Sequence, residues 1–379
     1  MRAAFAAILG AVLLGACTVL PEDQRPAPLI PLDHALKIRA AWSHRLGDWL
    51  SPPMGRLAPV VMEGRLYLVD GHDRLRVFDA ANGRPLWERP LGGRASSALG
   101  AGRGKLLLGM RDAEVWALDA GKGTVLWRQT VSSEVLVPPV AYQGSVLVRT
   151  GDEKVTVLSA EDGGRRWTYE QSVPALTLRG TSAPVAVDEA VYAGFANGKL
   201  AALDIRGGQI IWQVAIAAPR GRSELERMVD VDGDPLIVGP VLYTLAYQGR
   251  AVALSRTTGK VLWSRELSAV HGPVADDDLL YIADAGGVVW ALDRLSGAPV
   301  WKQEGLRHRA LSKPALFGDY LVVADFAGYL HWLSRRDGTV RGRYRMDDAG
   351  VVAALTPVGE RLYVVGASGV IEALKPPQP

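Results

Sequence analysis

The sequence predicts an all-β fold, an eight-bladed β-propeller with four-stranded antiparallel blades that an N-terminal strand closes. Three observations predict it: a repeat of constant length, short strand-like segments inside each repeat, and a last repeat that lacks its final strand. In the repeat a glycine is followed four residues later by a tryptophan, and in five of six copies a proline stands 28 residues before that tryptophan. The pairs are Gly83/Trp87, Gly123/Trp127, Gly163/Trp167, Gly208/Trp212, Gly259/Trp263 and Gly297/Trp301.

The segments between these markers have the composition of short strands. Seven stretches are rich in Val, Leu and Tyr, and each is followed by a glycine-containing turn and a second apolar run, which is typical of antiparallel hairpins. No window beyond the first twenty residues or so has sustained helical periodicity. The stretches are 65–70, 145–149, 191–194, 241–245, 279–283, 320–324 and 361–365.

Two copies depart from the repeat, and the last copy is incomplete. The second has Leu99 in the proline position, and the seventh keeps Pro314 and Gly338 but has Gly342 in the tryptophan position. We expect these departures to affect blade packing alone. An eighth copy ends before its glycine and tryptophan, whereas the run around Trp42 resembles the end of a repeat. Pairing that N-terminal run with the last blade would remove two unpaired sheet edges.

The repeated residues are expected to be structural. Glycine permits a turn conformation that is costly for other residues, and tryptophan packs between neighbouring blades. They therefore indicate which fold forms, and not which function it has. Lys and Arg number 43 against 40 Asp and Glu, and this formal net charge of +3 gives no argument for nucleic-acid binding.

The N-terminus reads as an export signal. Residues 1–16 hold Arg2 and then an apolar stretch too short for a membrane span, which predicts a signal peptide. They end in Leu-Gly-Ala before Cys17, the single cysteine, and this resembles a bacterial lipobox, which implies lipid attachment at Cys17. By resemblance to Gram-negative lipoproteins, Thr18 favours the outer membrane. The alternative is an ordinary cleavage site with an incidental cysteine.

The remaining chain divides in two. Residues 17–37, polar and proline-rich after the cysteine, are expected to form a flexible tether, and 38–379 the propeller. One cysteine excludes structural disulfides within the chain.

No pattern of catalytic or metal-binding residues is present in the sequence. Its repeats resemble those of the quinoprotein dehydrogenases, which carry pyrroloquinoline quinone, but those enzymes are longer and many have a disulfide of adjacent cysteines. Six histidines are scattered without metal-ligand spacing, and the Asp-rich run 230–234 lacks the acidic residue that a calcium loop needs at Val241. We therefore predict no enzyme, no cofactor and no metal. A quinoprotein-like dehydrogenase and a propeller that binds a small ligand in its channel remain the alternatives.

Two adjacent internal links between repeats are longer than the other internal links. Most links span 10 to 13 residues, but 17 separate Trp167 from Pro184 and 23 separate Trp212 from Pro235. Extra loop length on one side of a repeat protein often marks its binding face. These links combine aliphatic, arginine and acidic residues, which suits protein recognition. The candidate residues are Leu176, Leu178, Arg179, Asp230 and Asp232.

With these two links, the chain resembles the BamB family, the propeller lipoproteins of the outer-membrane β-barrel assembly machinery. The resemblance covers Cys17 to the end and includes the Leu-x-Leu-Arg-Gly-x-Ser-Ala-Pro run at 176–184 and the Asp-Val-Asp run at 230–232. It implies that both runs bind BamA through one of its periplasmic POTRA domains. The alternative is ordinary loop packing for the leucines and a solvated turn for the aspartates.

The resemblance also implies a function and a location. It describes a non-catalytic scaffold, lipid-anchored at the periplasmic face of the outer membrane, that assists the folding and insertion of outer-membrane proteins. It leaves open direct contact with unfolded outer-membrane proteins.

Overall fold

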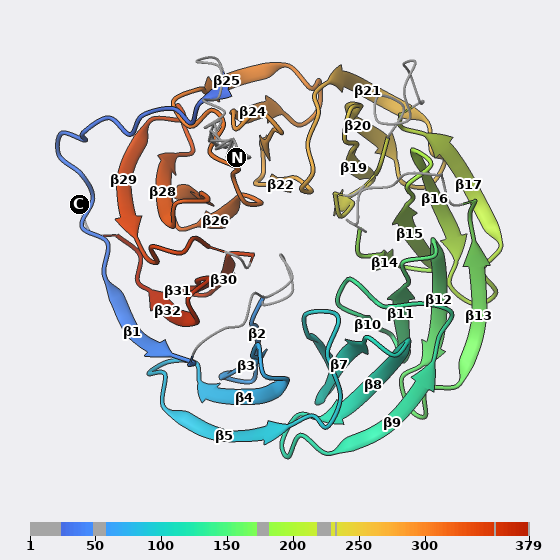
Figure 1. Cartoon of the computed structure of the whole chain (residues 1–379). Helices are drawn as coiled ribbons and strands as arrows, with labels where there is room; N and C mark the ends of the chain where they lie inside the picture. The colour runs from blue at the N-terminus through green and yellow to red at the C-terminus, as the bar shows by residue number, and fades with distance from the viewer. Residues whose placement is uncertain are drawn as a thin grey trace, which may run out of the picture.

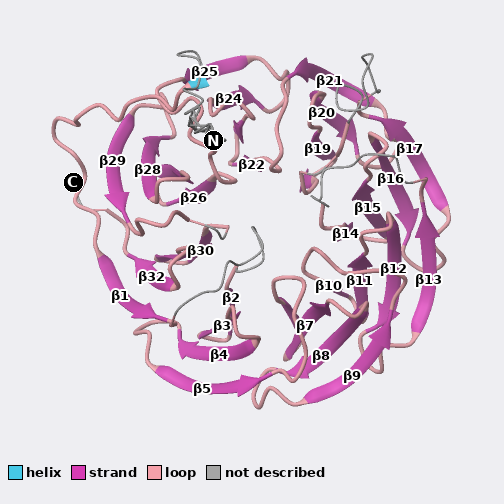
Figure 2. Ribbon diagram, in the orientation of Figure 1, coloured by secondary structure: helices cyan, strands magenta, loops and turns pink. Residues whose placement is uncertain are grey.

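The computed structural model describes residues 24–47, 58–172, 182–217, 229–231, 233–351 and 354–377. These residues form eight four-stranded antiparallel sheets arranged as the blades of a ring (Figure 1), so the predicted fold class is confirmed. Strands and loops make up almost all of the described chain, which contains no α-helix (Figure 2). In that part of the chain no helix is long and apolar enough to cross a membrane.

We number the blades from the first complete repeat: blade 1 is β2–β5, blade 7 is β26–β29, and blade 8 is β30–β32 with β1. The innermost strands are β2 (Val60–Met62), β6 (Gly100–Gly102), β10 (Val140–Tyr142), β14 (Val185–Val187), β18 (Leu236–Val238), β22 (Val274–Ala275), β26 (Ala315–Phe317) and β30 (Thr356–Val358). The second strands are β3 (Arg65–Val69), β7 (Lys105–Met110), β11 (Ser145–Arg149), β15 (Ala190–Gly194), β19 (Val241–Leu245), β23 (Leu279–Ala283), β27 (Tyr320–Ala324) and β31 (Arg361–Val365).

The outer half of each blade contains the longer strands. The third strands are β4 (Arg74–Asp79), β8 (Glu114–Asp119), β12 (Lys154–Ser159), β16 (Lys199–Asp204), β20 (Arg250–Ser255), β24 (Val289–Asp293), β28 (Tyr329–Ser334) and β32 (Val370–Leu374). The outermost strands are β5 (Pro85–Pro90), β9 (Val125–Thr130), β13 (Arg165–Glu170), β17 (Ile210–Ala215), β21 (Val261–Glu266), β25 (Pro299–Gln303), β29 (Val340–Arg345) and β1 (Ala40–Arg45).

The N-terminal strand closes the ring, as predicted. Strand β1 pairs antiparallel with β32, so the order in blade 8 is β1-β32-β31-β30. Trp42 on β1 reaches the next blade, where its indole N–H donates to the carbonyl of Ala80 at 3.1 Å. The two ends of the chain thus share one sheet, which removes the free edges that an open ring would have.

The apolar core lies between the blades. Buried side chains of the described residues form eight clusters, and each cluster joins two neighbouring blades. The cluster between blades 8 and 1, for example, combines Trp42 and Ile371 with Leu66 and Phe78. Because every blade takes part in two such clusters, no blade has a complete core of its own.

Each repeated tryptophan packs on the repeated glycine of the following blade. A Cβ atom added to Gly208, whose φ is +74°, would lie 2.7 Å from Cε3 of Trp167, so only glycine fits there. Trp167 also donates its indole N–H to the carbonyl of Ile205 at 2.8 Å. The structural interpretation of the repeat is therefore confirmed. The contacts are Trp42/Gly83, Trp87/Gly123, Trp127/Gly163, Trp167/Gly208, Trp212/Gly259, Trp263/Gly297 and Trp301/Gly338.

The described part of the predicted flexible tether, residues 24–37 of 17–37, contacts the ring. From residue 27 onward it is fastened to the outside of blades 6 and 7, and we call residues 27–39 the strap. Its side chains Leu29, Leu36 and Ile38 pack against the clusters that flank blade 7, which explains why an extended polar-looking segment stays on the ring. Its backbone amides donate to carbonyls of the ring at two places, Ala27 N to Arg307 O and Leu36 N to Arg341 O, both at 2.9 Å.

The strap accounts for the missing tryptophan in the seventh repeat. A Cβ atom on Gly342 would lie 2.9 Å from Cδ1 of Ile38 and 3.1 Å from Cβ of Leu36. In blade 8 the third and fourth strands belong to opposite ends of the chain, so no glycine turn joins them for a tryptophan to cover. The strap packs where the tryptophan side chain of the seventh repeat would lie, and Gly342, which has no side chain, leaves room for it.

Candidate protein-binding face

The ring has two faces that differ in the connections they carry. Successive turns of an antiparallel sheet lie at alternate ends. The links between blades therefore share one face with the turns between second and third strands, and we call this the link face. The other two turns of each blade lie on the turn face. Both longer internal links leave from the link face, one between blades 3 and 4 and one between blades 4 and 5. The link that closes the ring, from Trp42 in blade 8 to Pro59 before blade 1, also spans 17 residues.

Most of the predicted site residues lie outside the described part of the chain. Among the residues predicted to bind a partner, Asp230 alone is described. The roles of the others stay predictions. The residues outside the described ranges are Cys17, Leu176, Leu178, Arg179 and Asp232.

Asp230 differs from the expectation of an exposed carboxylate on a solvated link. Its side chain is fully buried, between Val229 and Val231, which are themselves buried in the cluster joining blades 4 and 5. Its carbonyl accepts a hydrogen bond of 2.8 Å from the amide of Tyr247. The end of the long link is thus inserted into the core, because its two valines bury apolar surface there. A buried carboxylate depends on its partners inside the protein, so removing Asp230 is expected to disturb folding as well as any contact.

A buried ion pair joins blades 3 and 4 at the link face. Arg149 and Glu153, both almost completely buried, join their side chains at 2.7 Å. Arg149 also donates to the carbonyl of Gly194 at 3.1 Å, and its guanidinium lies 4.5 Å from the centre of the Phe195 ring. The Glu153 carboxylate accepts from the amide of Ala196 at 2.7 Å. These contacts fasten blade 3 to blade 4 at the link face.

The sequence reasoning above missed this pair, although a signal was present. Arg149 occupies the last position of a second strand, where the other blades have small or apolar residues. An arginine there has no solvent to reach and needs a specific partner. The residues at this position in the other blades are Val69, Met110, Gly194, Leu245, Ala283, Ala324 and Val365.

In the Asp-rich run 230–234, which was considered above as a calcium loop, Asp234 connects neighbouring parts of the ring. Its Oδ1 accepts a hydrogen bond of 2.7 Å from the amide of Ala183, and its Oδ2 lies 3.5 Å from Nζ of Lys313. These contacts connect the innermost parts of blades 4, 5 and 7. Within the described ranges, no group of three or more His, Cys, Asp or Glu side chains could hold a metal ion.

The protein is an eight-bladed β-propeller, and comparison with known proteins identifies its family. The family model described as "Outer membrane protein assembly factor BamB" matches residues 39–124 and 94–303. The assembly factor BamB of Kangiella koreensis is 41% identical over 373 residues, which cover 98% of this chain and 96% of that protein. The crystal structure of BamB from Moraxella catarrhalis matches with a TM-score of 0.81 and 25% identity, covering 89% of this chain and all of that one. The chain belongs to the BamB family of outer membrane protein assembly factors.

The likeness to quinoprotein dehydrogenases is restricted to the fold. A europium-containing methanol dehydrogenase matches with a TM-score of 0.71 but only 14% identity, over 87% of this chain and 84% of that one. At this identity the match shows a shared architecture alone, because a fold does not determine the chemistry of its sites. The sequence relationship places the chain with the assembly factors and not with the dehydrogenases.

Proposed function

We propose that this protein is a non-catalytic, lipid-anchored scaffold of the outer-membrane β-barrel assembly machinery. It binds BamA through a POTRA domain and assists the folding and insertion of outer-membrane proteins. The observation that carries this proposal is the 41% identity to an assembly factor over 98% of the chain. Lipid attachment at Cys17 would hold the protein at the periplasmic face of the outer membrane.

We infer that the partner binds the link face over blades 3 to 5. Both longer links leave the ring there, and the ring below them is braced by the Arg149–Glu153 pair and by the buried residues 229–231. A braced base lowers the ordering cost of binding. On the first link, Arg179 offers a planar fork of donors for a carboxylate or a backbone carbonyl, and Leu176 and Leu178 offer apolar contact area.

Substitution of Arg179 tests this interface. We expect Arg179→Ala to weaken binding to the purified POTRA domains of BamA at least tenfold, because truncation of a central interface arginine typically costs about 2 kcal/mol or more. Asp232→Ala tests the second link, and it is preferable to Asp230→Ala because Asp230 is buried. Binding is measured by calorimetry, and folding by circular dichroism.

Arg206→Ala is the matched control. Arg206 is exposed, pairs with the exposed Glu189, and lies in the turn between β16 and β17 on the opposite face of blade 4. We expect it to bind like the wild type. Wild-type affinity of both Arg179→Ala and Asp232→Ala would exclude these links as the contact.

A further inference from the structure

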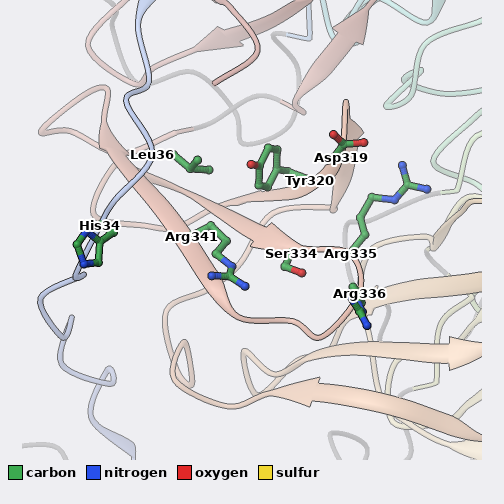
Figure 3. A pocket seen from close by; sticks show the side chains of 8 residues that line it. All are labelled: His34, Leu36, Asp319, Tyr320, Ser334, Arg335, Arg336 and Arg341. Atoms are coloured by element: carbon green, nitrogen blue, oxygen red, sulfur yellow. The ribbon is translucent and has the colours of Figure 1, made fainter. Parts of the chain in front are cut away.

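A basic groove lies between the strap and blade 7 on the turn face (Figure 3). It has a volume of about 630 Å³, and its lining includes His34 from the strap and Asp319, Arg335, Arg336 and Arg341 from blade 7. Three arginines and a histidine therefore share the groove with a single carboxylate. The volume falls in the range that accommodates a small-molecule headgroup.

Two of the three arginines in the groove are available to bind an anion, because only one is held by a strong ion pair within the described residues. Arg335 is held by Asp276 of blade 6, whose Oδ2 accepts from its Nη2 at 2.7 Å and from its Nε at 3.1 Å. Arg341 lies 3.8 Å from Asp337, but both side chains are exposed, and such a pair contributes little. Arg336 is exposed, and its side chain has no hydrogen-bond or ion-pair partner in the described part of the chain. Arg336 and Arg341 can therefore bind an anion.

The groove lies in the most basic part of the sequence around blade 7. Residues 297–345 contain nine Lys and Arg but four Asp and Glu, an excess larger than the +3 of the whole chain. The rest of the chain therefore has a small negative balance. Paired arginines with planar guanidinium groups are well suited to phosphate oxygens. The groove thus favours a ligand that carries a phosphate over a neutral ligand.

The strap connects blades 6 and 7 to the segment that follows the predicted anchor. Ala27 is fixed to blade 6 by its amide, which donates to Arg307, and by its carbonyl, which accepts from Arg309 at 3.0 Å. Ala27 follows Cys17 by ten positions, which gives a reach of about 35 Å at full extension. Ala27 lies at the link face, because Arg307 and Arg309 belong to the link between blades 6 and 7. A strand of six residues spans roughly 20 Å, so this reach is longer than the ring is thick and extends past the turn face. A lipid at Cys17 would therefore keep blades 6 and 7 within reach of the membrane surface.

We propose that the groove binds the phosphate of an anionic lipid headgroup and thereby turns the turn face of blade 7 toward the membrane. This inference rests on the lipid anchor of the proposed function for its choice of a lipid phosphate over a soluble one. Arg336 and Arg341 bind the phosphate, and His34 borders it from the strap. In this orientation the link face, on the other side of the ring, stays accessible to a protein partner.

Vesicle binding of the unlipidated protein tests the groove independently of the anchor. The Cys17→Ser protein is mixed at low salt with vesicles of phosphatidylcholine alone or with phosphatidylglycerol, and bound protein is measured by sedimentation. We expect binding to the phosphatidylglycerol vesicles only, and at least tenfold weaker binding after Arg336→Glu with Arg341→Glu, since each basic residue adds attraction to an anionic surface. Whether Cys17→Ser leaves the membrane fraction in cells is a separate readout, so failure of the anchor and failure of the groove are distinguishable.

Arg84→Glu with Arg165→Glu is the matched control. Both arginines are exposed and follow the glycine turns of blades 1 and 3, so they lie on the same face but elsewhere around the ring. We expect this variant to bind within about twofold of its Cys17→Ser parent. Equal loss in both double variants, or no binding of the parent to phosphatidylglycerol, would overturn the proposal. Inorganic phosphate that binds the groove as tightly as the lipid vesicles do would also overturn it, in favour of a soluble ligand.

Discussion

At the scale of single residues, the ring is joined by a tryptophan and a glycine that never belong to the same blade. The glycine has a positive φ and lies under the indole of the preceding blade, where an added Cβ atom would come within 3 Å of the ring in all seven contacts. Two constraints thus act on one residue, the backbone conformation and the close approach of the indole. This explains why the spacing of glycine and tryptophan stays constant while the links between repeats vary.

Gly208→Ala separates these two constraints when it is compared with Gly64→Ala. Gly208 (φ +74°) meets Trp167, whereas Gly64 (φ +72°) has nothing within 4 Å of its added Cβ. We expect Gly64→Ala to lower the free energy of unfolding by about 1 kcal/mol, from backbone strain alone, and Gly208→Ala by about 2–4 kcal/mol. Urea denaturation measures both. Equal losses would mean that the indole contact adds nothing to the requirement for glycine.

Residue patterns predicted the fold better than they predicted the site. The spacing of glycine and tryptophan repeats six times in the sequence, so chance agreement is small and the blades can be predicted. Asp230 has no such repetition, and its burial depends on how a long link folds back between two blades. Arg149 could have been found, because it breaks an apolar pattern, but its partner Glu153 could not be chosen from sequence alone.

At the scale of elements, the strap is held by a buried polar cluster in blade 7. Arg309 binds the Asp325 carboxylate at 2.6 Å and the strap carbonyl of Ala27, and Arg343 binds another strap carbonyl. His331 lies between them, 2.9 Å from Asp325 through Nε2, while its Nδ1 accepts from Nε of Arg343 at 3.4 Å. His331 is therefore neutral, with its proton on Nε2, and donates to an ionised Asp325.

Burial and partners shift the pKa values of this cluster. Burial lowers the pKa of His331 below its usual 6.5, against the pull of Asp325. Burial on its own would raise the pKa of Asp325, but its hydrogen bonds with His331 and Arg309 outweigh that effect and lower the pKa below 3.8. The folded protein thus binds fewer protons at both groups than the unfolded chain does. Stability is fully present above pH 6.5 and falls as the pH decreases, first through His331 and later through Asp325.

His331→Gln tests the pH dependence. Glutamine can donate to Asp325 but does not titrate, so we expect the variant to lose less stability than the wild type between pH 7.5 and pH 5, even if it is less stable at pH 7.5. The measurement is the urea midpoint at several pH values. His72→Gln, at an exposed position, is the control and should keep the wild-type slope. The same slope in His331→Gln would show that His331 does not couple to folding.

The strap was not predicted because composition averages over its residues. Four prolines between 21 and 31 indicate an extended chain, and the strap is extended, but three apolar side chains fasten it to the ring. The departure at Gly342 contained the missing information. A repeat without its tryptophan leaves apolar surface uncovered at that position, and another segment has to pack there. The repeat pattern identifies the position that needs a covering segment, but it does not identify the strap as that segment.

At the scale of the whole molecule, eight shared clusters make the ring a single cooperative unit with two distinct faces. The two longer internal links leave the ring at the link face between blades 3 and 5, and the turn face carries the basic groove of blade 7. Because no blade has its own core, the ring can present both faces in fixed relation to each other. This arrangement suits a scaffold that connects a membrane surface to a protein partner.

Affinity purification from cells tests the scaffold function most directly. The full-length, lipidated protein is tagged at its C-terminus and purified from outer membranes in mild detergent, beside the Arg179→Ala variant. We expect BamA to be recovered with the wild-type protein at a constant ratio, and to be depleted at least several-fold with the variant. If the folded wild-type protein is recovered from the membrane without BamA, while BamA itself still purifies with other assembly components, the protein is not a scaffold of this machinery.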